Sequence, residues 1–161
     1  MKIKTIPLTK LTLRHNEKLQ EIIRFDDCFL SFPKAIHTIP FAIAQILLDS
    51  APILALKNEQ GECFQLALNM NAALLMSHPE RHKLTVNVHY YAHDEVDDVL
   101  IASSFYFPAL AYREHNKITR HFFSRITEAK RLLLNVPTKK QLATLMAVSA
   151  STIRDKKVTN E

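Results

Sequence analysis

The pattern of hydrophobic and polar residues along the chain changes character near residue 108. Before that point, segments with alternating or continuous apolar patterns typical of strands are interleaved with short segments of helical spacing. The strand-like segments are the opening stretch up to Pro7, 52–58, 63–69 and 84–91. Gly61, the only glycine, favours a tight turn between two of them. The order predicts an α+β fold, with a small mixed sheet and packed helices over residues 1–108 and an all-helical module over 109–161.

Four segments of the first part have the spacing of helices. Residues 16–25 are amphipathic, 71–78 consist of strong helix formers that stop at a proline, and 94–107 begin with a carboxylate-rich turn that a helix dipole favours. Residues 39–49 begin with a proline-containing turn and are apolar on nearly every side. That last pattern predicts a helix buried in the core.

The stretch 138–157, TKKQLATLMAVSASTIRDKK, has the pattern of a helix-turn-helix. Thr138 and Gln141 can form a capping box at the start of the first helix, and Ser149 can cap a second helix that buries Ile153 against the first. The first helix has an apolar inward stripe formed by Leu142, Ala143, Leu145 and Met146. A plain helical hairpin is the alternative to this interpretation.

Two positions depart from the usual helix-turn-helix pattern. Ala147 stands at the turn position that usually holds glycine. Lys156 and Lys157 stand about one turn after Ile153, where a further apolar residue would be expected. We therefore expect the end of the second helix to be frayed or to need a partner.

Positive charge is concentrated in the last third of the chain. Residues 113–161 hold eleven Lys or Arg against four Asp or Glu, which gives this part a net charge of +7, whereas the net charge of the whole chain is +5. This asymmetry indicates a module that binds a polyanion, and a solvated basic face is the alternative. The candidate contacts to bases and phosphates are Thr138, Lys139, Lys140, Ser149, Ser151, Thr152, Arg154 and Lys157, with Arg120 and Arg125 on the phosphate backbone.

Taken in order, these segments resemble the ParB family of plasmid and chromosome partition proteins, whose N-terminal fold is shared with sulfiredoxin. IKTIPLTKL is similar to the family's opening strand, and APILALKNEQGECFQLALNMNAALLM has the shape of its hairpin and helix. HKLTVNVHYY falls where the next strand would follow, and TEAKRLLLNVPTKKQLATLMAVSASTI parallels the stretch that contains the helix-turn-helix. The resemblance covers almost the whole chain. It implies a ParB/sulfiredoxin-like sheet and a helix-turn-helix that binds double-stranded DNA.

The nucleotide motifs of that family are degenerate in this chain. The positions that match the stretch around the CTP triphosphate are uncharged: Asn69, Met70, Asn71 and Ala72. The second motif is echoed, with altered spacing, by Glu114, Asn116 and Arg120. An altered pocket would use Asn69, Asn71, Asn116 and Arg120. We expect no cofactor and little or no CTP binding or hydrolysis. The sulfiredoxin reaction is not expected either, because Cys63 lies several residues upstream of the loop that would need a cysteine.

Other chemistry has weaker support in the sequence. The histidine pairs do not place two imidazoles on one helical face, so no metal site is expected: His78 with His82, and His89 with His93. The aromatic stripe at 105–112 could stack on bases, but a place in the core is favoured. No apolar run is long enough to cross a membrane, and both cysteines are expected to be reduced, so we expect a cytoplasmic protein.

The sequence therefore predicts a non-enzymatic DNA-binding protein that acts in plasmid or mobile-element partition or in transcription. One alternative is a nucleotide-dependent switch with an altered pocket. Another is an adaptor that binds a second partition or replication protein. The sequence leaves open whether the chain forms a homodimer.

Overall fold

The computed structural model describes residues 1–12, 14–26, 36–57, 63–111 and 116–154. Of residues 116–118 it describes the backbone alone. By its internal contacts the chain divides into two compact units. Unit 1 comprises Met1–Asn16 and Cys28–Val96, and unit 2 comprises Glu17–Asp27 and Asp97–Glu161. This grouping places residues 17–27 and 97–108 with the C-terminal helices, whereas the sequence pattern predicts them in the first domain. The domain boundary at residue 108 stays a prediction.

Unit 1 is built on a mixed five-stranded sheet in the order β1-β5-β3-β4-β2. The strands are β1 Lys2–Pro7, β2 Arg14–His15, β3 Ile53–Lys57, β4 Cys63–Gln65 and β5 Thr85–Tyr91. β1 with β5 and β3 with β4 are antiparallel, while β3 with β5 and β2 with β4 are parallel. The predicted α+β class, the opening edge strand and the three later strands are therefore confirmed. The predicted turn at Gly61 lies outside the described residues.

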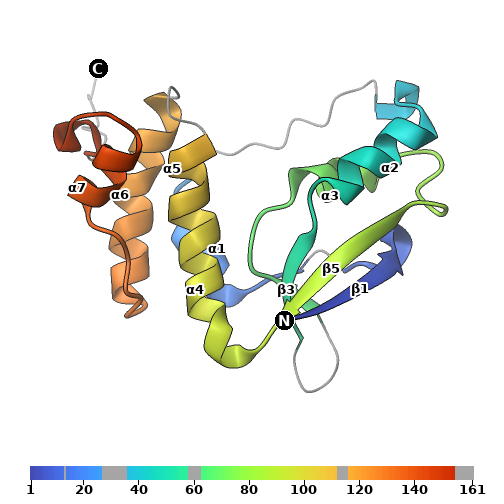
Figure 1. Ribbon diagram of the computed structural model, residues 1–161, viewed down its shortest axis with the longest axis horizontal. Helices are drawn as coiled ribbons and strands as arrows, with labels where there is room; N and C mark the ends of the chain where they lie inside the picture. The colour runs from blue at the N-terminus through green and yellow to red at the C-terminus, as the bar shows by residue number, and fades with distance from the viewer. Residues whose placement is uncertain (13, 27–35, 58–62, 112–115, 155–161) are drawn as a thin grey trace. The chain divides into compact units, whose positions relative to one another are not determined.

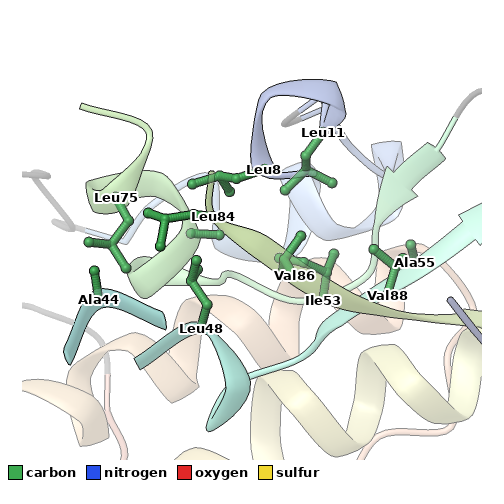
Figure 2. Close-up of a cluster of buried hydrophobic side chains, with 11 residues drawn as sticks. Leu8, Leu11, Ala44, Leu48, Ile53, Ala55, Leu75, Leu84, Val86 and Val88 are labelled. Atoms are coloured by element: carbon green, nitrogen blue, oxygen red, sulfur yellow. The ribbon is translucent and has the colours of Figure 1, made fainter. Parts of the chain in front are cut away.

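Helices cover one face of this sheet. α2, Phe41–Asp49, and α3, Met70–Leu75, lie side by side, and the amide of Asn71 donates to the carbonyl of Leu47 at 2.9 Å (Figure 1). Figure 2 shows the core that forms beneath them, where Leu48 and Leu75 gather over the strands with Val86 and other apolar residues. Burial of each such side chain stabilises the fold by roughly 1.5 to 3 kcal/mol.

Helix α2 differs from the sequence prediction, which was a helix buried on nearly every side. Ala44 and Leu48 are buried, but Ile43 is 48% exposed and Ile46 is 60% exposed. A helix that lies on a sheet can turn only one stripe toward it, so the outer stripe of α2 keeps its apolar side chains in solvent.

Unit 2 is helical. Its elements are α1 Glu17–Ile23, α4 Val96–Ile101, a π-helix at Ala102–Tyr106, α5 Phe107–Ala111, α6 Asn116–Arg131, α7 Lys139–Leu145 and a 3-10 helix at Ala150–Thr152. The first residue of α4, Val96, is grouped with unit 1. The rings of Phe105 and Phe122 stack in the core with centroids 6.3 Å apart. The aromatic stripe is thus split, because Phe105 is buried as favoured but Tyr106 and Phe107 are exposed. No helix among the described residues has the length and apolar character to cross a membrane.

Helices α6 and α7 are each followed by a residue with a positive φ, Leu133 after α6 and Ala147 after α7, and neither of these residues is glycine. After α6, Leu134 N–H donates to Ala129 and Leu133 N–H donates to Lys130, both at 3.0 Å, and Leu133 has a φ of 60°. This is the Schellman arrangement, in which the left-handed position favours glycine because a Cβ there contacts the following carbonyl.

Leu133→Gly should therefore stabilise the protein by about 0.5 to 1 kcal/mol. The Leu133 side chain is 93% exposed, so its removal costs little packing, while the left-handed backbone loses its steric penalty. Urea unfolding measures the change. Leu133→Ala is the matched control and should leave the stability nearly unchanged, because it keeps the Cβ. A less stable glycine variant would contradict this account of the α6 terminus.

Candidate nucleic-acid interface

Helix α7 begins at the capping box that the sequence predicts. The Thr138 hydroxyl accepts a hydrogen bond from Gln141 N–H at 3.2 Å, and the Gln141 side-chain oxygen accepts one from Thr138 N–H at 2.7 Å. Two backbone donors at the helix start are thereby satisfied. The prediction of this helix start is confirmed.

The inner side of α7 and the turn after it are also as predicted. Of the inward stripe, Leu142, Ala143 and Met146 are buried, and Leu145 is half-buried. Ala147 has a φ of 55°, so it occupies the left-handed position that usually holds glycine. The helix therefore ends at a defined residue, with Val148 N–H donating to the carbonyl of Ala143 at 3.0 Å.

The second element is shorter than predicted. Ser149 caps it by accepting from Ser151 N–H at 3.4 Å, and Ile153 is buried, both as expected. However, the predicted α-helix is a single 3-10 turn, Ala150–Thr152, and Ile153 leaves the helical region with a ψ of 84°. Ile153 is the last apolar residue that could hold such a helix against α7, because the residues one turn later are lysines. A complete helix-turn-helix is therefore not present in the described residues.

The polar candidates of this module lie on its surface. Thr138, Lys140, Ser149, Ser151, Thr152 and Arg154 are exposed. Lys139 is half-buried, and its ammonium lies 4.2 Å from the centre of the Phe123 ring, a cation–π contact with α6. Arg120 is exposed on α6, and Lys157 lies outside the described residues. The hydroxyls of Ser149 and Ser151 are 2.9 Å apart, so the start of the second element presents a pair of hydroxyl groups.

Arg125 requires a correction, because it does not lie on the surface. Its side chain is 13% exposed, and its guanidinium donates to both oxygens of Asp26, with 2.6 Å between Nη2 and Oδ2. The side chain of Asp26 is 2% exposed, and its Oδ1 also lies 2.9 Å from Nδ1 of His121. A guanidinium that is held by a buried carboxylate has no donor face left for a phosphate. We therefore remove Arg125 from the DNA-contact residues.

The π-helix explains the remaining contact of Arg125. A π-helix replaces the usual i to i−4 bonds by longer ones and leaves a carbonyl to be satisfied from outside the helix. Here the carbonyl of the buried Ser104 accepts from Nη1 of Arg125 at 2.6 Å. Arg125 thus joins the segment after α1, which carries Asp26, to α6 and the π-helix at one buried point.

Ion pairs also hold α1 against α6 near the end of α6. Glu128, whose side chain is 8% exposed, pairs with Arg24 at 3.1 Å and with Arg131 at 3.0 Å, and Arg131 also pairs with Glu21. The basic surface of α6 is therefore smaller than its sequence indicates. The pair of Glu128 with Arg131 is local, but Glu21 lies 110 residues before Arg131, and no local pattern could have identified it.

Asn69 and Asn71 of the degenerate nucleotide motif have structural roles. Asn69 caps α3 by accepting from Ala72 N–H at 2.8 Å, and its amide donates to the carbonyl of Ala51 at 2.7 Å. The amide of Asn71 is bonded to α2, as described above. Asn69 and Asn71 belong to unit 1, whereas Asn116 begins α6 and Arg120 follows one turn later, in unit 2.

Two polar groups of unit 1 are of chemical interest but are engaged within the unit. The Cys63 sulfur lies 3.2 Å from the Tyr90 hydroxyl, and burial together with this contact raises the pKa of Tyr90 to about 12. The buried His78 accepts from Glu80 N–H at Nδ1, so Nε2 is the nitrogen that donates to the carbonyl of Ile39 at 2.9 Å. Neither nitrogen of His78 is left to bind a metal.

No protein-family model matches the chain, and neither a curated protein nor a solved structure shows significant similarity to it. The resemblance to ParB proteins therefore stays a prediction that depends on the motifs quoted above.

Proposed function

We propose that the protein is a non-enzymatic, double-stranded DNA-binding protein that uses residues 138–154 of unit 2. The observation that carries the proposal is the geometry of this module. A capped helix and a defined turn are fixed from inside by buried apolar residues, while hydroxyl and basic side chains occupy the outside. Rigid placement of such groups is what a DNA-binding element requires.

Each exposed group has a role that suits its chemistry. Ser149, Ser151 and Thr152 carry short hydroxyls that can donate to phosphate oxygens or touch base edges. Lys140 and Arg154 supply positive charge at the two ends of the module, and Arg120 adds a cation on α6. The 3-10 turn is too short to read several base pairs by itself, so contacts to the phosphate backbone should dominate the affinity.

The salt dependence follows from the number of available cations. Arg125 and Arg131 are engaged in ion pairs, so the described cations of the interface are Arg120, Lys139, Lys140 and Arg154. Four phosphate contacts give a slope of log K against log salt of roughly −3.6, where six would give roughly −5. The whole chain, with the lysines after Arg154, should fall between these values.

Arg154→Ala should weaken binding to random duplex about tenfold and make the salt slope shallower by about one. Fluorescence anisotropy at several salt concentrations measures both quantities. Lys57→Ala is the matched control, since it removes one exposed charge from unit 1 and should leave both nearly unchanged. Equal losses from the two variants would point to a general charge effect, and binding that does not respond to salt would end the proposal.

The resemblance to ParB proteins supports a role in plasmid or mobile-element partition or in transcription. Asn69 and Asn71 of the degenerate nucleotide motif serve the fold, which supports a DNA-binding protein that works without CTP.

A further inference from the structure

We infer that the outer face of α2 is the interface of a homodimer, in which α2 packs antiparallel against α2 of a second copy around a twofold axis. The surface consists of Ile43 and Ile46, which lie three residues apart on α2 and therefore on the same side of the helix, and these residues are 48% and 60% exposed. Neighbouring apolar side chains on a soluble protein's surface typically mark an interaction site. This inference concerns unit 1 and does not depend on DNA binding.

The charges around the surface indicate which kind of partner it fits. Helix α3 has no charged residue, and α2 has only one, Asp49 in its last turn. Such a surface offers no cation for a nucleic acid or an acidic peptide. A second copy, in contrast, brings an equally uncharged apolar face, so the two surfaces complement each other.

The positions along α2 suit an isologous pair. Ile43 lies two residues after the first residue of the helix, and Ile46 lies three residues before the last. In an antiparallel pair centred on the helix, Ile43 of one copy therefore meets Ile46 of the other, and the same contact occurs twice.

The two ends of α2 provide charge complementarity for this orientation. Asp49 lies at the negative end of its own helix dipole, and no basic residue stands in the last turn to offset it. At the other end, Pro40 supplies no cap, and no side chain among the described residues caps the helix. An antiparallel second copy places Asp49 beside these backbone N–H groups, and a parallel one does not. One oxygen of Asp49 accepts from Gln45 at 2.9 Å, which holds the carboxylate at this end of the helix.

Analytical ultracentrifugation of the full chain without DNA tests the inference. The wild type should show a reversible monomer–dimer equilibrium, and Ile46→Glu should weaken it at least about 100-fold, because the substitution puts a charge into the interface twice. Leu133→Glu is the matched control, since it changes an even more exposed apolar residue in unit 2 and should leave the dimer intact. Circular dichroism checks that both variants are folded.

Asp49→Lys tests the orientation and should weaken the dimer about tenfold, because it brings a cation to the positive end of the opposite helix. A stronger dimer with Asp49→Lys would overturn the antiparallel arrangement. A wild type that stays monomeric at the highest accessible concentration would overturn the interface, as would a dimer that Ile46→Glu leaves unchanged. A monomer that Ile46→Glu destabilises would mean that another part of the chain covers α2, and would also overturn it.

Discussion

Replacing Arg125 with leucine should lower the free energy of unfolding by about 3 to 5 kcal/mol. The substitution leaves the carboxylate of Asp26 buried with only His121 beside it, and it leaves the carbonyl of Ser104 without its donor. A buried charge that loses its partner keeps its desolvation cost, which is why the effect exceeds that of a surface ion pair. Urea unfolding followed by circular dichroism measures the change.

Two controls make this experiment specific. Lys83→Ala breaks the exposed pair with Glu80 and should change the free energy of unfolding far less than Arg125→Leu does, because solvent screens the pair. The double variant Asp26→Leu with Arg125→Leu should lose clearly less than the sum of the two single variants, because no unpaired charge is then buried. If Arg125→Leu weakened DNA binding while the protein stayed fully stable, Arg125 would be a surface contact as the sequence predicts, and the buried network would be wrong.

Asn69→Ala should destabilise the protein by about 2 kcal/mol, the second largest effect on folding stability that we expect. The substitution removes the cap of α3 and also the amide that donates to the carbonyl of Ala51. The same residue falls in the degenerate nucleotide motif, so this variant separates a structural role from a binding role. Thermal and urea unfolding measure the loss.

Asn69→Ser provides the comparison, because a serine hydroxyl can still cap α3 but does not reach the carbonyl of Ala51. It should recover about half of the stability that Asn69→Ala loses. A variant at this position that unfolded like the wild type would show that Asn69 does not support the fold. The residue would then be available for a ligand, and the nucleotide-dependent alternative would gain support.

The features that depend on local pattern could be predicted from the sequence. Alternation located β3, β4 and β5, and the capping box located the first turn of α7, because both signals come from residues a few positions apart. Ala147 illustrates the same point. The Schellman geometry requires a left-handed residue at a fixed distance from the end of α7, whichever residue occupies it.

The features that depend on distant residues could not be predicted. Arg125 looks like a surface cation in its own helix, and only the fold brings it to Asp26, 99 positions earlier. The exposure of Ile46 depends on how much of α2 the sheet can cover, which an apolar pattern does not reveal. The second element after Ser149 is short because a longer helix would place lysines, not apolar residues, one turn after Ile153. In this case the sequence itself indicates that the helix is weak.

The route of the chain has a consequence for the evolution of this protein. Unit 2 draws one helix from residues 17–27 and the others from beyond residue 96, so the chain leaves it and returns. A fragment that starts at residue 109 would carry Arg125 without Asp26, and Phe122 without the ring of Phe105. The cationic module therefore cannot be transferred to another protein by a single recombination event at residue 109, and the two units are expected to be inherited together.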